Sequence, residues 1–199
     1  EAGEASRAGC DFIVIQGVQA GGHIRGSERL EAMLAPVLDS LTRPVMAAGG
    51  MATGSDLAAA LAAGAAGVRI GTRFVAALES GAHPQYAERL VAARAADTVL
   101  TERFSVLWPD APHRVLASAI AAADASEEDP VGEFSLADRR LPVARGSVIA
   151  PERHTTGGSE AMALYAGESV DAVSAREPAA DIVDGIVREA LAARGGSNG

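Results

Sequence analysis

Apolar positions near the start of the chain form one short buried run and then a helical stripe. Residues 11–16 are mostly apolar and β-branched and follow Gly9, which is typical of a buried parallel strand. A Gly-rich stretch over residues 17–26 predicts a loop. The helix expected after it has one apolar face at i, i+3, i+4, i+7 and i+8, made by Leu30, Met33, Leu34, Val37 and Leu38.

Two further strand-helix units follow with the same pattern. Residues 44–48 and 67–71 predict buried strands, and the helix after the first of them is expected to end at Gly64. Three consecutive units predict an α/β fold with a parallel sheet and right-handed crossovers. The residues expected to stop these strands or begin their helices are Gly49, Gly50, Ser55, Asp56, Gly71 and Thr72.

The pattern becomes mainly helical beyond Pro84. Helices are predicted over residues 84–95 and 115–123, and a last helix begins near Pro178. In residues 125–154, before the last helix, charged residues, Pro and Gly occur without periodicity, which predicts an irregular surface segment. The chain is therefore divided into β/α units with following helices (1–124), an irregular segment (125–154), a helical segment (155–194) and a flexible tail (195–199).

Composition narrows the class of protein. The chain has 199 residues, 48% of them hydrophobic, which is enough for the core of one domain. A net charge of −9 makes nucleic acid an unlikely partner, and the sequence lacks a membrane-spanning run and a signal peptide, so a cytoplasmic protein is expected. The single cysteine, Cys10, is expected to be buried and cannot form an internal disulfide, and no metal site is predicted.

All 17 basic residues are arginines, because the sequence contains no lysine. This excludes Schiff-base aldolases, pyridoxal-phosphate enzymes and P-loop hydrolases, which all need a lysine amine. The residues from Glu1 to Gly9 are typical of the end of a helix, so we expect the chain to begin within a domain.

Candidate chemistry lies in the loops that follow the three predicted strands. Gly21 and Gly22 would let a ligand approach the backbone, and His23 could move a proton near neutral pH. Gly50 and Gly71 also follow strands, where α/β barrels bind phosphate groups beside a helix N-terminus. The alternative is that these are tight turns beside a surface histidine.

Three segments in this order and spacing, residues 14–23, 44–51 and 65–74, resemble the nitronate monooxygenase (2-nitropropane dioxygenase) family. Residues 98–104, 108–116 and 160–170 resemble the C-terminal region of that family. The resemblance implies the C-terminal portion of a TIM (β/α)8 barrel, about strands six to eight, followed by a helical C-terminal segment. It also implies that the N-terminal strands of the barrel are missing.

The resemblance also assigns roles to residues. It implies that His23 is the catalytic histidine and that Gln19 stands where an acidic residue is frequent, next to the substrate. Arg69 would contact the cofactor through its backbone. The residues that it implies for binding FMN, mainly at the ribityl phosphate, are Gln16, Gly21, Gly50, Arg69, Ile70, Gly71 and Thr72.

The function implied by this resemblance is FMN-dependent oxidation of an alkyl nitronate by O2 to a carbonyl compound and nitrite. A small molecule and O2 would be its partners, and a homo-oligomer is possible. One alternative is an NAD(P)H-dependent flavin reductase, of the quinone reductase or enoyl-acyl-carrier-protein reductase II type. Another is an inactive truncated fragment. Of the other histidines, His113 could cover the active site but is expected to be structural. His83 is expected to be a solvated turn residue before a helix, and His154 lies in a polar stretch.

Overall fold

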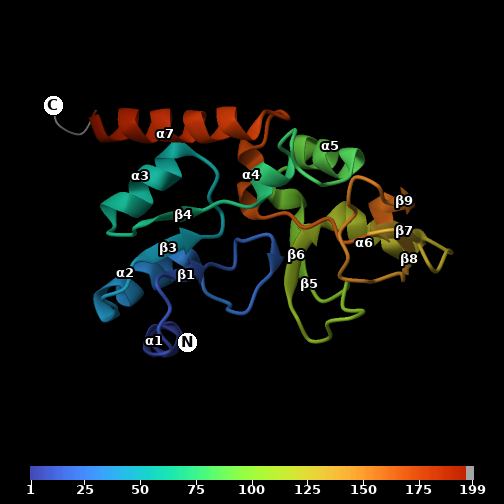
Figure 1. Cartoon of the computed structure of the whole chain (residues 1–199), viewed down its shortest axis with the longest axis horizontal. Helices are drawn as coiled ribbons and strands as arrows, with labels where there is room; N and C mark the ends of the chain where they lie inside the picture. The colour runs from blue at the N-terminus through green and yellow to red at the C-terminus, as the bar shows by residue number, and fades with distance from the viewer. Residues whose placement is uncertain (196–199) are drawn as a thin grey trace.

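The computed structural model describes residues 1–195, in which three sheets of three strands each are joined by helices. The parallel sheet with α2 and α3 makes one half of the molecule in Figure 1, and the two antiparallel sheets make the other half. The elements are α1 (Ala2–Arg7), β1 (Ile13–Gln16), β2 (Gly22–His23), α2 (Leu30–Ser40), β3 (Val45–Ala48), α3 (Gly54–Ala62), β4 (Gly67–Arg69), α4 (Thr72–Val75), α5 (Pro84–Ala92), η1 (Ala95–Asp97), β5 (Thr98–Thr101), β6 (His113–Leu116), α6 (Ala117–Ala125), β7 (Gly132–Leu136), β8 (Arg139–Val143), β9 (Thr156–Gly157), η2 (Ser159–Ala161), η3 (Glu168–Ala172) and α7 (Ala179–Gly195).

The parallel sheet confirms the predicted α/β class. Its strand order is β1-β3-β4, with Ile15 opposite Ala47 and Met46 opposite Gly67. Alternate residues of β1 and β3 pack with apolar residues of α2 and α3 in a first core cluster. A Cβ at Gly67 would lie 2.9 Å from Met46 Cε, so the end of the methionine side chain packs directly on this glycine. Each β/α unit is therefore held by apolar side chains on the face of the sheet that the helices cover.

Helix α3 is capped by a residue other than the two predicted. Thr53 is the N-cap, and its side chain accepts a hydrogen bond from the Asp56 amide at 3.2 Å. The Asp56 carboxylate accepts from the Thr53 amide at 2.8 Å, which completes a capping box. The prediction of Ser55 or Asp56 as the cap was therefore wrong by two or three residues. Figure 1 shows α7 lying along α3, and a Cβ at Gly54 would lie 2.4 Å from the Ile186 carbonyl oxygen.

A second sheet, β2-β6-β5, lies where the sequence predicted a loop and the start of a helix. His23 of β2 pairs with His113 of β6, and Thr98 of β5 pairs with Leu116. The helix predicted over residues 115–123 is shifted, because β6 occupies its first turn and α6 begins at Ala117. Cross-strand pairing fixes the backbone here, and it cannot be seen in the local pattern.

The third sheet corrects the prediction of an irregular segment over residues 125–154. Strands β7 and β8 form a hairpin there, with Gly132 opposite Val143, and β9 pairs with the other edge of β7. Side chains at the tip of the hairpin are exposed, with Leu136 at 60%. The sequence there lacks the apolar pattern of a buried strand, so the two strands were not predicted. The segment predicted to be helical over residues 155–194 contains β9, two short 3₁₀ helices and coil before α7. Gly195 ends α7, and residues 196–199 of the predicted tail lie outside the described residues.

Cys10 is exposed, contrary to the prediction that it is buried, because it follows α1, which buries none of its residues. Within residues 1–195, no helix is both long and apolar enough to cross a bilayer. The same residues contain no cluster of three or more His, Cys, Asp or Glu side chains suited to a metal ion.

Candidate active site

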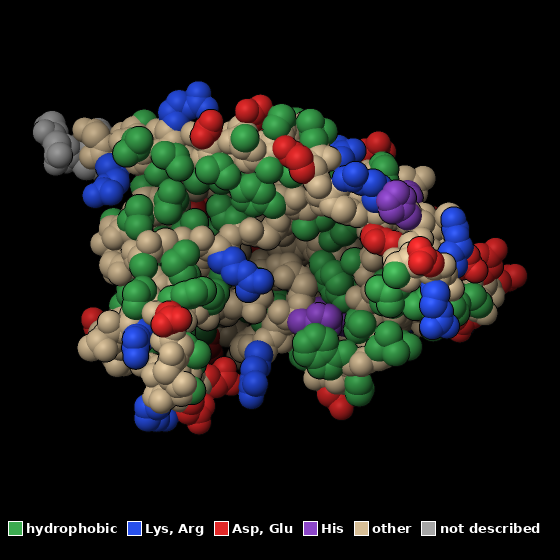
Figure 2. Space-filling model, in the orientation of Figure 1, with side chains coloured by type: hydrophobic (Ala, Val, Ile, Leu, Met, Phe, Trp, Pro, Cys, Tyr) green, Lys and Arg blue, Asp and Glu red, His purple; other side chains and the backbone are tan. Residues whose placement is uncertain are grey.

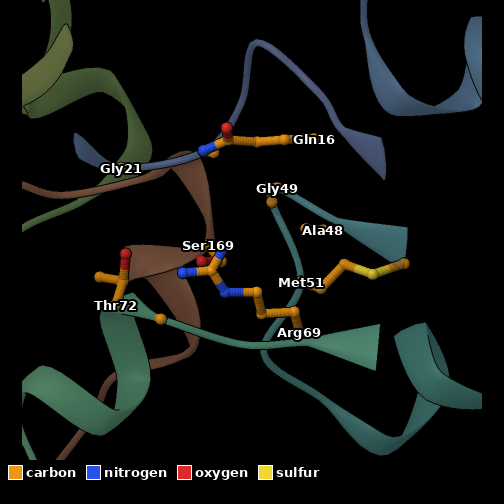
Figure 3. Close-up of a pocket in the computed structure, with 11 residues that line it drawn as sticks. Gln16, Gly21, Ala48, Gly49, Met51, Arg69, Thr72 and Ser169 are labelled. Atoms are coloured by element: carbon orange, nitrogen blue, oxygen red, sulfur yellow. The ribbon is translucent and has the colours of Figure 1, made fainter. Parts of the chain in front are cut away.

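A cavity of about 110 Å³ lies where the carboxyl ends of the three parallel strands meet. Figure 3 shows Gln16 on one side of it, Arg69 and Thr72 on the other, and Ser169 from the C-terminal segment between them. Figure 2 shows one face of the molecule hollowed near its centre. The described residues that line the cavity are Gln16, Ala20, Gly21, Ala48, Gly49, Gly50, Met51, Arg69, Gly71, Thr72 and Ser169.

Most of the predicted cofactor residues meet in this cavity. Six of the seven line it, namely Gln16, Gly21, Gly50, Arg69, Gly71 and Thr72. Ile70 does not, and instead packs with a cluster formed by α3, α4 and α7 that includes Leu57, Ala77 and Ile182. Successive residues of extended chain point to opposite faces, so Ile70 faces the helices when Arg69 faces the cavity.

The glycines leave backbone accessible at the cavity. Gly49 and Gly50 have φ angles of +98° and +73°, a region that favours glycine. An added Cβ at Gly71 would meet no atom within 4 Å, so the space above this residue is open. A ligand can therefore reach the Gly71 backbone without a side chain in the way.

The Arg69 side chain differs from its expected role. Its guanidinium group points into the cavity toward Ser169 in Figure 3, whereas the sequence assigned it a backbone contact only. Among the described lining residues Arg69 is the one with a charged side chain, which makes the cavity electropositive. An open glycine backbone beside an arginine suits a phosphate group.

Thr72 connects the cavity to the C-terminal segment. Its side chain is 7% exposed, and its hydroxyl oxygen accepts a hydrogen bond from the Gly167 amide at 3.0 Å. A hydroxyl group has one donor and two acceptor sites, so the same group can also donate its hydrogen to a ligand. The same segment brings Ser169 to the cavity, a residue that the sequence reasoning missed. Ser169 lies in the last stretch that resembles the family, at residues 160–170, and this was the available signal.

His23 lies beside the cavity and not in its lining. The backbone carbonyl of His23 accepts a hydrogen bond from Nε2 of Gln16 at 3.3 Å, which connects it to a lining residue. Its imidazole stacks on Trp108, with ring centroids 4.3 Å apart, and also contacts His113 and Tyr165 at 5.2 and 5.5 Å. Burial, and secondarily the nearby His113, lower the pKa of His23 below its ordinary 6.5. The imidazole is therefore neutral near pH 7 and able to accept a proton.

Comparison with known proteins decides the family. The family described as nitronate monooxygenase matches residues 1–189. The chain belongs to the nitronate monooxygenase family. A probable nitronate monooxygenase of Bacillus subtilis is 42% identical over 106 residues, which are 49% of this chain and 30% of that protein.

Two solved structures also resemble the chain. Nitroalkane oxidase from Streptomyces ansochromogenes aligns with a TM-score of 0.73 and 32% identity, over 100% of this chain and 56% of the oxidase. FabK from Thermotoga maritima aligns with a TM-score of 0.70 and 28% identity, over 97% of this chain and 58% of FabK. The chain thus spans little more than half the length of these relatives. As a member of this family it is related to oxidoreductases.

Gln19 has a buried structural role at the start of α2. Gln19 was expected next to the substrate, but it is 2% exposed and lies against the start of α2. Its amide oxygen accepts from the Leu30 amide at 3.1 Å, and its amide nitrogen donates to the Glu31 carboxylate at 2.8 Å. An ionised acidic residue here could not donate a hydrogen bond to the Glu31 carboxylate and would repel it, whereas the glutamine amide donates one.

Proposed function

We propose that this chain provides the phosphate end of an FMN site and the catalytic histidine of an enzyme that oxidises alkyl nitronates. O2 is the second substrate, and a carbonyl compound and nitrite are the products. One observation carries the proposal. Six residues expected to bind the cofactor, which come from three separate loops, line a single electropositive cavity with His23 beside it.

We further propose that β1, β3 and β4 are the sixth, seventh and eighth strands of a TIM barrel. Their parallel order and the glycines at their carboxyl ends support this placement, since barrel enzymes build their sites from these loops. The similarity to nitroalkane oxidase over the whole chain supports it as well.

Each group at the cavity has a proposed task. The open backbone at Gly71 and the Arg69 guanidinium would hold the phosphate, and the Thr72 hydroxyl would donate a further hydrogen bond. Gln16 and Gly21 line the opposite side, where the flavin ring would approach His23. FMN, when bound, supplies the electron chemistry, and the protein supplies position and charge.

His23 has the task of moving a proton. A nitroalkane carries an acidic hydrogen on the carbon next to its nitro group. Neutral His23 would remove this proton, leaving the electron pair of the C–H bond in the nitronate anion. A nitronate supplied as the anion needs no such step, and for that substrate neutral His23 would only orient the ligand.

Equilibrium titration with FMN and with riboflavin tests the cavity assignment. The two flavins share the same ring system and differ in the phosphate, so a phosphate site should bind FMN at least tenfold more tightly. The protein with Arg69→Met should lose most of this preference, because methionine keeps an unbranched chain and removes the charge. Equal affinity for FMN and riboflavin in the unsubstituted protein would refute the assignment.

A flavin reductase that uses NAD(P)H is the second candidate. The similarity to FabK, with a TM-score of 0.70 over 97% of the chain, favours the reductase. The similarity to nitroalkane oxidase, with a TM-score of 0.73, favours nitronate oxidation only slightly more. Both candidates use the same cofactor cavity and differ in the source of electrons. Reduction of the bound flavin under nitrogen, by a nitronate or by NADH, separates the two.

A further inference from the structure

Trp108 lies against the proposed catalytic histidine although it belongs to an exposed loop. Its indole stacks on the His23 imidazole at a centroid distance of 4.3 Å and an interplanar angle of 20°. The Trp108 side chain is nevertheless 55% exposed, and that of its neighbour Leu107 is 75% exposed. One face of the indole therefore covers His23 while much of the ring remains open to solvent.

His113 holds both ends of the loop that carries Trp108. Its side chain is fully buried, and its Nε2 accepts a hydrogen bond from the Phe104 amide at 3.2 Å. Its Nδ1 lies 2.9 Å from the Ala111 carbonyl oxygen and must be the protonated nitrogen, because a carbonyl can only accept. A single imidazole thus joins residues 104 and 111 across the base of the loop.

The backbone of this loop has further constraints. The Val106 amide donates to the Gly146 carbonyl at 3.0 Å, and the Val106 carbonyl accepts from the Val148 amide at 3.2 Å. Leu107 and Asp110 have φ angles of +81° and +54°, a left-handed region that residues other than glycine rarely adopt. Surrounding contacts must hold such a conformation, so the position of Trp108 is defined by the loop.

His23 itself has few polar contacts that could orient its ring. Its Nε2 is buried and has no hydrogen-bond partner within the described residues 1–195. The contacts of the ring are aromatic, with Trp108, His113 and Tyr165. Among these, Trp108 makes the closest and most nearly parallel contact.

We propose that Trp108 is a positioning residue for His23 and that His113 presents it by joining the ends of the loop. The inference rests on the proposed function of His23 as the base. Stacking on the indole sets the plane of the imidazole and shields one of its faces from water. The first effect favours a fixed orientation of the ring beside the cavity, and the second favours its neutral form.

The neighbours of His23 define how the ring should titrate. The titratable groups that contact it are His113 and Tyr165, and burial raises the pKa of Tyr165 to about 12, so this phenol remains neutral. Burial is the larger cause of the lowered pKa of His23, and the indole provides part of that burial. Removal of the indole should therefore raise the pKa of His23 toward 6.5 and move the acid limb of nitroalkane turnover to higher pH.

NMR titration of the histidine ring protons tests the contact without relying on activity. The chain has four histidines, so their signals can be assigned with single His→Asn variants. With Trp108→Ala, the His23 ring protons should lose the ring-current shift of the indole and titrate at higher pH. Trp108→Phe should retain most of both effects, and Leu107→Ala, in the same loop, should change neither. An unchanged His23 shift and pKa in Trp108→Ala would overturn the proposal.

His113→Phe tests the second part, because it keeps a buried ring and removes both hydrogen bonds. It should reduce the Trp108 ring-current shift on His23, and a fully retained shift would contradict the role of His113. In turnover of a nitroalkane, Trp108→Ala should lower kcat more than it raises KM, with recovery in Trp108→Phe. A protein that responds in these NMR experiments but converts no nitroalkane would contradict the proposed function while supporting the positioning role.

Discussion

Gly21 and Gly167 approach each other backbone to backbone. A Cβ at Gly21 would lie 2.5 Å from the Gly167 nitrogen, and a Cβ at Gly167 would lie 2.7 Å from the Gly21 nitrogen. Next to this contact, the Glu168 amide donates to the Gln19 carbonyl at 2.9 Å. The C-terminal segment is thereby fixed against the loop after β1, and this brings Ser169 to the cavity.

Gly21→Ala should separate these two segments. The methyl group would meet backbone atoms, which cannot move aside as a flexible side chain can, so we expect a loss of roughly 1–3 kcal/mol in unfolding free energy. FMN affinity should fall as well, because Ser169 moves with the segment. Chemical denaturation and FMN titration measure the two effects. Gly81→Ala is the matched control, since an added Cβ there meets no atom within 4 Å; equal stability of the two variants would contradict this account.

Gly71→Val should affect the cofactor and not the fold. The space above Gly71 is open, so the apoprotein should keep its unfolding free energy to within about 0.5 kcal/mol. The valine methyl groups would occupy the space proposed for the phosphate, and FMN retention should be abolished. Flavin content after purification measures this. An undiminished FMN content in the variant would show that this loop does not hold the phosphate.

Thr72→Val should destabilise the protein even without a ligand. The substitution removes the oxygen that accepts from the Gly167 amide and leaves a buried donor unpaired, at a cost of about 1–3 kcal/mol. Thr72→Ser keeps this oxygen and should recover most of the loss. Urea unfolding of the apoproteins is the measurement. If valine and serine variants are equally stable, the Thr72–Gly167 hydrogen bond contributes nothing.

His23→Asn should separate proton removal from the later chemistry. Turnover of a neutral nitroalkane should fall by roughly 10²-fold or more, the scale for loss of a general base. Turnover of pre-formed nitronate should fall less, and FMN binding should survive because His23 is outside the cavity lining. Steady-state rates with both substrates test this. Equal losses would mean that His23 orients the ligand or stabilises charge instead of acting as a base.

The sequence predicted those parts of the fold that local patterns encode. The apolar runs of β1, β3 and β4 and the amphipathic stripe of α2 each bury one defined face, so periodicity identified them. Strand β6 was missed because it has four residues and runs directly into the Ala-rich helix α6. Its conformation depends on pairing with β5, across the loop between the two strands, and with β2, which lies far away in the sequence.

The candidate site was predictable to a similar degree. Glycines at the ends of parallel strands indicated where a ligand could approach, and Gly50 and Gly71 do line the cavity. The direction of the Arg69 side chain and the contribution of Ser169 depend on tertiary packing, so the pattern of residues could not indicate them. The stack of Trp108 on His23 likewise joins residues 85 positions apart in sequence.

Anaerobic mixing of the FMN-loaded protein with a pre-formed alkyl nitronate and, separately, with NADH tests directly whether nitronates reduce the bound flavin. The visible absorbance of the flavin is bleached when bound FMN accepts electrons, and the electron donor distinguishes the two candidate functions. We expect rapid bleaching by the nitronate, at a rate that depends on its concentration, and little change with NADH. Bleaching by NADH but not by the nitronate would exclude the proposed oxidation of nitronates.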